Sequence, residues 1–183
     1  NFMQRLDSPY TYFRPISNDY RDHVIGDVNK NISNYHGENY GMEAPFHLYT
    51  MKKLDNKNEN NEAIVIDPGD EKEKILDILS TKKVVGLLVT HYHFDHIGAL
   101  KDLKDKYGLQ VNVIPKGFQC EIINTPGHTK DSKSFCFRDI NAIFVGDFIF
   151  KGKIGRTDLG GNNEEMKKSI KMFLDSDLED MIL

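Results

Sequence analysis

The chain has 183 residues, 39% of them hydrophobic, so it is long enough to form one domain with a buried core. Its formal net charge is −4 and its lysines and arginines form no dense block, which argues against a nucleic-acid partner. No apolar run reaches the roughly 18–20 residues that span a bilayer, so we expect no membrane partner.

Residues 1–44 are rich in Tyr, Asn, Asp and Gly and show little hydrophobic periodicity. We expect an N-terminal extension there, ordered only in part. The pattern changes near Phe46, where segments typical of strands and helices begin to alternate. The sequence therefore predicts an extension over 1–44 followed by an α/β domain over 45–183.

The first half of this domain is predicted from alternation, apolar runs and acidic first turns. In chain order we expect a strand over 46–51, a polar hairpin tip over 55–62, a strand over 63–69 that ends in a Pro-Gly turn, a helix over 70–80, a buried strand over 84–90 and a helix over 97–108. Gly108 would end that last helix.

The second half is predicted to contain four further strands, one helix and the beginning of a last strand. The predicted strands cover 109–114, 120–124, 134–137 and 142–147, and the last one begins at 180–183. A helix is expected over 162–176, because Asn162 can cap it and acidic residues follow in its first turn.

The segment THYHFDHIG, directly after the apolar strand over 84–90, gathers several side chains that can bind a metal. His91, His93 and His96 supply imidazole nitrogens, and Asp95 supplies a carboxylate. These are more ligand groups than one tetrahedral ion easily takes from so short a loop. The segment therefore predicts a loop that two ions share.

Two further candidate ligands stand alone downstream. His128 in TPGHT and Asp147 in VGD each follow an apolar strand and a glycine. Gly127 and Gly146 allow the tight backbone path that lifts one side chain out of a strand end. Together with the histidine cluster, these residues indicate a site built from separate strand ends.

IDPG, THYHFDHIG, TPGHT and GD, in this order, resemble the motifs of the metallo-β-lactamase-fold hydrolases. GKIGRTDLGG is similar to the corresponding loop of their glyoxalase II-like branch, the hydroxyacylglutathione hydrolases. The resemblance covers residues 46–183. It implies an α/β four-layer αββα sandwich with a metal site at one edge between two sheets.

The resemblance also implies two divalent ions as cofactors, with zinc as the default and iron or manganese as alternatives. The implied ligands are His91, His93 and His128 for the first ion, Asp95 and His96 for the second, and Asp147 as the bridge between them. Asp67 in IDPG is similar to an aspartate that supports the ligands from behind.

The implied activity is hydrolysis of a small-molecule thioester by a hydroxide that bridges the metal ions. Asp95 would be catalytic, since it could orient the hydroxide and accept its proton. Lys151, Lys153 and Arg156 are candidates for contacts with the substrate. The chain has Arg156-Thr157-Asp158 where the glutathione-thioester hydrolases carry a Lys and a Tyr, which leaves the acyl group and the thiol carrier open.

Two alternative functions stay open. A mononuclear iron persulfide dioxygenase-like enzyme would use His91, His128 and Asp147 as its iron ligands. A non-catalytic metal-binding scaffold is the second alternative, because the family's last histidine ligand has no counterpart after His128. We expect the domain to continue beyond Leu183, where that ligand would be due.

The two cysteines, Cys120 and Cys136, form no CxxC motif and no disulfide framework. We expect them to be buried apolar residues in a reducing compartment, the cytoplasm first and an organelle second. The sequence leaves the oligomeric state open.

Overall fold

The computed structural model describes residues 28–35, 46–55, 58–150, 153–176 and 178. They fall into two compact units, an N-terminal unit that ends at Phe118 and a C-terminal unit that begins at Gln119. The candidate substrate residue Lys151 and the strand expected over 180–183 lie outside the described residues. Among the helices described, none has the length and apolar character needed to cross a membrane.

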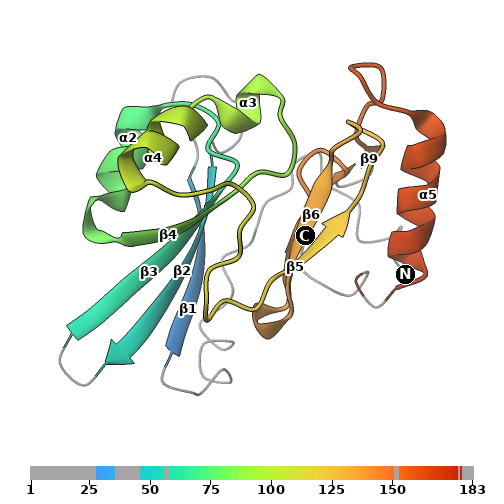
Figure 1. Ribbon diagram of the computed structural model, residues 1–183. Coiled ribbons are helices and arrows are strands. Elements are labelled where there is room, and N and C mark those ends of the chain that lie inside the picture. Colours follow the sequence, from blue (N-terminus) through green and yellow to red (C-terminus); the bar gives the residue numbers. More distant parts are fainter. Residues whose placement is uncertain (1–27, 36–45, 56–57, 151–152, 177, 179–183) are drawn as a thin grey trace. The chain divides into compact units, whose positions relative to one another are not determined.

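The N-terminal unit contains a four-stranded sheet with the order β1-β2-β3-β4 (Figure 1). Its strands are β1 Val28–Tyr35, β2 Phe46–Asp55, β3 Asn58–Ile66 and β4 Lys83–Leu88. The first three strands are antiparallel, and β4 runs parallel to β3. The polar hairpin tip expected over 55–62 is wrong in extent, because β3 already pairs with β2 from Asn58. Ladder hydrogen bonds join main-chain groups, so a polar run can continue a strand.

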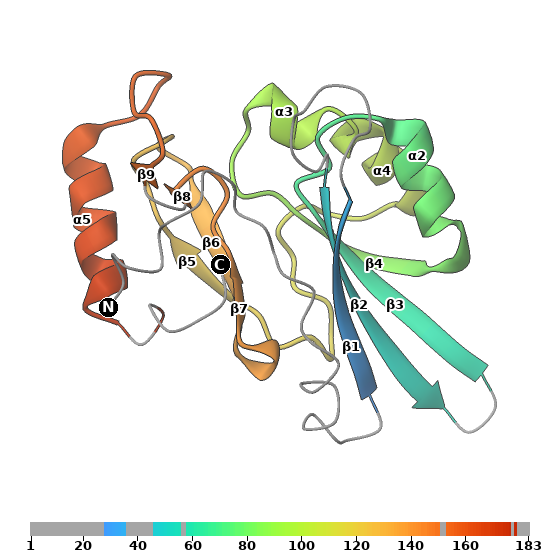
Figure 2. The same cartoon turned by 180° about the vertical axis from the view of Figure 1, so that it is seen from behind.

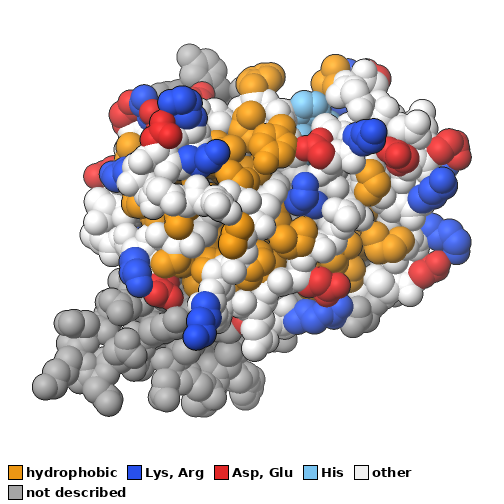
Figure 3. Space-filling model, in the orientation of Figure 1, with side chains coloured by type: hydrophobic (Ala, Val, Ile, Leu, Met, Phe, Trp, Pro, Cys, Tyr) orange, Lys and Arg blue, Asp and Glu red, His pale blue; other side chains and the backbone are white. Residues whose placement is uncertain are grey.

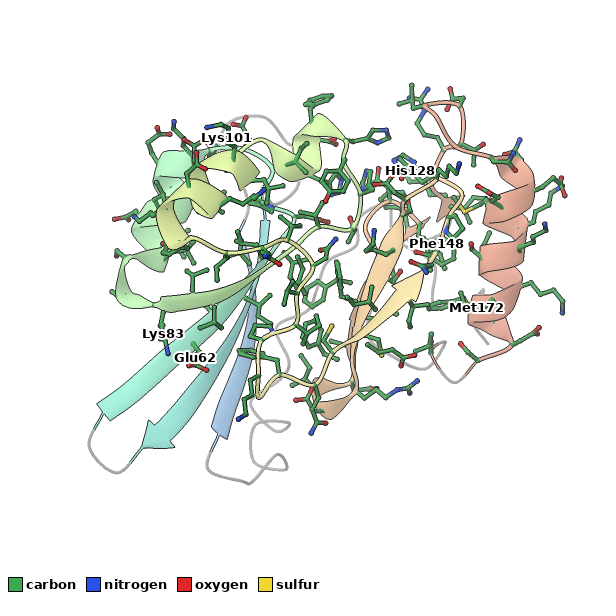
Figure 4. The ribbon with its side chains drawn as sticks, viewed as in Figure 1. Glu62, Lys83, Lys101, His128, Phe148 and Met172 are labelled. Atoms are coloured by element: carbon green, nitrogen blue, oxygen red, sulfur yellow. The ribbon has the colours of Figure 1, made fainter. Side chains whose placement is uncertain are left out.

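Helices cover one face of this sheet (Figure 1). They are α2 Lys72–Ile78, the short 3-10 turn Leu79–Thr81, the single turn α3 Phe94–Ile97 and α4 Leu100–Tyr107. Their apolar side chains meet β3 and β4 in one buried cluster, Ala63, Val65, Ile75, Leu79, Val84, Leu87, Val89, Ala99, Leu100 and Leu103. Where β4 begins, its first residue Lys83 forms a 3.0 Å ion pair with Glu62 of β3 (Figure 4).

The strand expected over 109–114 is wrong. Only Val111 forms an isolated bridge, to Leu87 of β4. The next residue, Asn112, has a left-handed backbone with φ 60°, which ends any extended run. Its side chain supplies the hydrogen bonds that a neighbouring strand would otherwise make, since Oδ1 accepts from Val89 N at 2.7 Å and Nδ2 donates to Val89 O at 3.2 Å.

The C-terminal unit contains an antiparallel sheet with the order β5-β6-β7 and a separate hairpin of β8 and β9. Its elements are β5 Glu121–Asn124, β6 Lys133–Phe137, a 3-10 turn Arg138–Ile140, β7 Ala142–Phe144, β8 Ile149–Phe150, β9 Lys153–Ile154 and α5 Asn163–Leu174. The predicted cap of α5 is confirmed, because the Asn162 side chain accepts from Glu164 N and Glu165 N.

Helix α5 lies along one face of this sheet (Figure 2). The core between them contains Cys136, Ile143, Val145, Phe148, Ile149, Met166, Phe173 and Leu178. Within it, the rings of Phe148 and Phe173 meet edge to face with centroids 5.9 Å apart. Because Phe148 follows Asp147 directly, this packing anchors the chain next to a candidate ligand.

Charged side chains of both signs are interspersed over the face shown in Figure 3. Several form exposed ion pairs along the helices, such as Lys74–Glu71, Lys101–Asp105 and Lys171–Asp175. Exposed pairs of this kind contribute roughly 0–1 kcal/mol each. The stability of both units therefore depends mainly on their apolar cores.

Candidate functional site

Three histidine rings gather at the end of β4 in the N-terminal unit. His91 is only 1% exposed, and its Nε2 lies 3.1 Å from Nδ1 of His93. The ring of His96 lies against that of His91, with centroids 4.1 Å apart. Apposed imidazole nitrogens repel unless a proton or a cation lies between them, so this crowding suits a cation site.

Asp67 lies behind these rings and is buried. Its Oδ2 accepts hydrogen bonds from Nδ1 of His96 at 2.9 Å and from the hydroxyl of Thr90 at 2.7 Å. Its Oδ1 accepts from Thr90 N at 2.7 Å. Burial acts to raise the pKa of Asp67, but the hydrogen bond and charge of His96, together with Thr90, hold that pKa below its ordinary value.

The turn that carries Asp67 also fixes the helix after the histidines. Ala99 N donates to Pro68 O at 3.0 Å. A Cβ on Gly98 would lie 1.8 Å from the carbonyl oxygen of Gly69, so only glycine allows this approach. This contact separates α3 from α4 and sets where Asp95 and His96 lie. The Asp95 side chain is 57% exposed, and its Oδ2 lies 3.9 Å from Nε2 of His96.

His128 follows β5 in the C-terminal unit (Figure 4). The preceding Gly127 has a φ of 150°, and a Cβ there would lie 2.5 Å from Cα of Met166 in α5. The ring is 2% exposed, and its Nδ1 lies 2.7 Å from the carbonyl oxygen of Arg156. Since a carbonyl only accepts, Nδ1 carries a proton, and in the neutral ring Nε2 has the lone pair.

Asp147 lies beside His128 in the same unit. Its Oδ2 is 3.5 Å from Nε2 of His128, and its side chain is 29% exposed. Gly146 before it has a left-handed φ of 52°, as its place after a strand suggested. A Cβ on Gly155 would lie 1.6 Å from the Asp147 carbonyl oxygen and 3.4 Å from Cβ of His128. The loop at Gly155 therefore packs tightly against both candidate ligands.

The other candidate substrate residues lie on that loop and its hairpin. Nζ of Lys153 lies 5.2 Å from the ring centroid of Phe150, its partner across the hairpin. Arg156 forms a two-contact ion pair with Asp158, with Nε–Oδ1 at 2.7 Å and Nη2–Oδ2 at 2.6 Å. The guanidinium of Arg156 thus pairs within its own loop, while its carbonyl oxygen holds His128.

Sequence reasoning missed the hydroxyl groups around the candidate ligands. Thr90 contacts Asp67 with both its hydroxyl and its main-chain nitrogen, and its hydroxyl also lies 3.1 Å from Nδ1 of His91. In the C-terminal unit, the Ser132 hydroxyl lies 2.7 Å from that of Thr129 and accepts from Thr129 N. Position was the available signal, because Thr90 and Thr129 each adjoin a candidate histidine.

The donor sets of both units fit a divalent metal ion. Imidazole nitrogens and carboxylate oxygens are the donors that zinc, iron and manganese take in proteins. A histidine ligand also needs its second nitrogen held by another group. His91, His96 and His128 each have such a partner, respectively Thr90, Asp67 and the Arg156 carbonyl.

Comparison with known proteins gives the family. Residues 57–118 match the model of the metallo-beta-lactamase superfamily. The probable metallo-hydrolase YqgX of Bacillus subtilis is 31% identical over 153 residues, covering 61% of this chain and 72% of that protein. The hydroxyacylglutathione hydrolase GloC of Haemophilus influenzae is 28% identical over 155 residues, covering 61% of this chain and 73% of that protein.

Solved structures agree on the fold. The BLEG-1 B3 metallo-beta-lactamase superposes with a TM-score of 0.63 at 24% identity, covering 76% of this chain and 83% of that chain. TTHA1623 in a di-iron-bound form superposes with a TM-score of 0.57 at 22% identity, covering 88% of this chain and 86% of that chain. These matches confirm the predicted fold class, and the chain belongs to the metallo-beta-lactamase superfamily.

Proposed function

We propose that this protein is a metal-dependent thioester hydrolase of the hydroxyacylglutathione hydrolase type. In this proposal the two clusters of candidate ligands form one centre for two divalent ions, with zinc as the default. The ligands would be His91, His93 and His128 for the first ion, Asp95 and His96 for the second, and Asp147 as the bridge.

One observation carries the proposal furthest. His91, His96 and His128 each have one ring nitrogen held by a buried side chain or a main-chain carbonyl. An incidental group of surface histidines has no reason to be ordered in this way, whereas metal ligands require it. The name of the Haemophilus influenzae relative supports the reaction type, and the di-iron form of TTHA1623 supports a centre of two ions.

The chain's own groups have separate roles in this reaction. When bound, divalent ions polarise a carbonyl group and lower the pKa of water. Asp95, the most exposed of the acidic candidates, orients the attacking water and takes up its proton. Asp67, Thr90 and the Arg156 carbonyl keep the histidine rings in the orientation and tautomer that ligands need.

The substrate class is a small activated ester, with a thioester as the first choice. Arg156 is paired with Asp158, so Lys153 is the remaining described cation among the candidate substrate residues. Its ammonium group suits an anionic group on the thiol carrier, with glutathione as the first compound to test.

Metal content and turnover of one preparation test the proposal. The purified protein is loaded in turn with zinc, iron and manganese, and its metal content and hydrolysis of a panel of thioesters are measured. Asp147→Ala should lose most of the bound metal and nearly all turnover, because it removes the proposed bridge. Asp131→Ala is the matched control, since Asp131 is an exposed acidic residue of the same unit.

The other outcomes point elsewhere. One iron per chain with oxygen uptake in the presence of a persulfide would favour the dioxygenase alternative. Bound metal without turnover of any thioester would favour the scaffold. Two ions and an unchanged rate in Asp147→Ala would remove Asp147 from the bridge.

A further inference from the structure

We infer that Ser169, in the middle of α5, positions the turn that carries His128. The Ser169 hydroxyl donates to the carbonyl oxygen of Pro126 at 2.7 Å, 43 residues earlier in the chain. The role of this contact in metal binding rests on the proposed function, because His128 is a proposed ligand. The contact itself lies within the C-terminal unit and requires no metal.

The place of Ser169 in α5 explains why its hydroxyl group needs a partner. The buried residues of this helix are Met166, Ser169 and Phe173, and Ser169 is 4% exposed. A hydroxyl group among apolar side chains costs free energy unless it forms a hydrogen bond. In a helix interior, a serine hydroxyl commonly bonds to the carbonyl group four residues earlier. The hydroxyl of Ser169 donates to a different segment of the chain, so it joins α5 to that segment.

The acceptor is placed where it can fix the turn. Proline has no N–H group, so the carbonyl is the one main-chain group of Pro126 that can form a hydrogen bond. Because the peptide bond is planar, a hydrogen bond to this oxygen also fixes the direction of the N–H group of Gly127. That N–H donates to the carbonyl oxygen of Thr129 at 3.0 Å. The two hydrogen bonds together therefore set the turn in which His128 lies.

The same side of α5 contacts the turn at two further places. Asn162, Met166 and Ser169 follow the i, i+4, i+7 spacing of one helix face. The main-chain nitrogen of Asn162 donates to the carbonyl oxygen of Gly127 at 2.8 Å. A Cβ on Gly127 would lie 2.5 Å from Cα of Met166, so the main chain of the turn touches the helix directly. Three contacts from one helix face therefore hold the two residues that precede the histidine.

His128 thus has two supports with different effects. The carbonyl oxygen of Arg156 accepts from Nδ1 of the ring at 2.7 Å and orients the ring. Ser169 contacts the main chain two residues before the ring and sets the point from which the side chain projects. Since Ser169 acts through the turn, it is a positioning residue. Its removal should let the turn move while the hydrogen bond from the ring to Arg156 remains possible.

The test compares Ser169→Ala with Ser176→Ala. Ser176 also donates its hydroxyl to a main-chain carbonyl, that of Phe173 at 2.6 Å, but this bond lies at the end of α5 and not at the turn. Hydrogen exchange in the metal-free protein is followed by NMR. The amides of Gly127 and Asn162 should exchange faster in Ser169→Ala and at the unmodified rate in Ser176→Ala. Ser169→Thr keeps a hydroxyl group and should restore the slow exchange.

Zinc affinity, measured by competition with a chelator, gives a second readout. Loss of a partner behind a ligand typically weakens metal binding about 10–100-fold. Ser169 acts one step further away, so we expect a loss of about tenfold in Ser169→Ala and near-normal affinity in Ser169→Thr and Ser176→Ala. Cobalt(II) serves as a spectroscopic probe, since its visible absorption depends on the geometry of its ligands. At saturation the spectrum should change in Ser169→Ala alone, whereas a variant that is merely less stable keeps the original spectrum.

Three results would overturn the inference. They are unchanged exchange at Gly127 and Asn162 in Ser169→Ala, an unchanged zinc affinity in that variant, and an equal loss of zinc affinity in Ser169→Ala and Ser176→Ala. If Ser169→Thr failed to fold, the two alanine variants would still decide. An unmodified protein that binds neither zinc nor cobalt would remove the proposed function, whereas faster exchange in Ser169→Ala alone would still support the hold of α5 on the turn. The two inferences can therefore fail separately.

Discussion

His128 donates a hydrogen bond from Nδ1 to the carbonyl oxygen of Arg156, 28 residues further along the chain, at 2.7 Å. Because the acceptor is a main-chain group, its position depends on the course of the loop rather than on the identity of residue 156. Two features hold that loop, the Arg156–Asp158 ion pair and the close approach of Gly161 to the carbonyl oxygens of Gly127 and His128.

Asp158→Asn should weaken zinc binding by less than about tenfold, because the ion pair is exposed and supports the ligand only through the loop. The hydrogen bond from Arg156 lowers the pKa of Asp158 to about 2. A lowered carboxyl pKa means that the pair is fully formed above the ordinary value of 3.8 and is lost only as the pH falls towards 2. The difference in zinc affinity should therefore stay constant from weakly acidic to weakly alkaline pH and shrink in high salt.

Competition with a chelator measures the zinc affinity of both proteins, and an affinity difference that varied over neutral pH would contradict this prediction. Asp175→Asn, which breaks the exposed pair on α5, is the control.

Gly155→Ala should lower both the free energy of unfolding and the affinity for metal. The added Cβ would lie 1.6 Å from the Asp147 carbonyl oxygen, so the backbone must move. We expect this movement to lower the free energy of unfolding by about 1–3 kcal/mol. Gly160→Ala is the control in the same loop. A Cβ added at Gly160 would meet nothing within 4 Å. The φ of 89° at Gly160 makes alanine strained there too, but this strain involves no contact with a candidate ligand. Urea unfolding and zinc titration of both variants separate the two effects, and equal zinc affinity would show that Gly155 does not position the site.

The order of strands and helices could be predicted where local pattern and tertiary contacts agree. The acidic first turn and apolar spacing gave α2, and Asn162 gave the start of α5. The break between α3 and α4 could not be predicted, because its cause is the contact of Gly98 with Gly69, which is distant in the sequence. The sequence instead predicted one helix over 97–108.

The candidate ligands could be recognised from the sequence because several histidines and an aspartate share one short segment. Their partners could not, since a hydroxyl such as that of Thr90 is common and a carbonyl such as that of Arg156 belongs to every residue. That the ligand clusters of the two units form a single centre stays a prediction, for which the test is the metal content of Asp147→Ala.

The expectation that both cysteines are buried is confirmed for Cys136, whereas Cys120 is only partly buried. The thiol of Cys120 should still react slowly in the folded protein. Burial, followed by the nearby Cys136 and acidic side chains, raises the pKa of Cys120 to about 12 from an ordinary 9.0. The thiolate fraction at neutral pH then falls about a thousandfold, and the thiolate is the nucleophile. Mass spectrometry after brief iodoacetamide treatment should find Cys120 unmodified in the folded protein and alkylated in urea. Equally fast alkylation in both states would show that the thiol is not protected by burial.

Asn112→Ala should destabilise the N-terminal unit and loosen the backbone just before the candidate ligands. Asn112 is bonded to both main-chain groups of Val89, a fully buried residue two positions before His91. Alanine leaves those groups without their partner, at about 1–3 kcal/mol, and also tolerates φ 60° poorly. Asn112→Gly separates the two causes, because glycine accepts the backbone angle but supplies no side chain.

Hydrogen exchange of the Val89 amide distinguishes these contributions. Exchange should speed up in both Asn112→Ala and Asn112→Gly, since both lose the acceptor Oδ1. Only Asn112→Ala also has the backbone strain, so its urea midpoint should be lower than that of Asn112→Gly. Unchanged exchange at Val89 in both variants would mean that the residue after β4 needs no such partner. The hydrogen bonds of the Asn112 side chain would then follow from the turn at 112, and they would not be the reason why the segment 109–114 forms no strand.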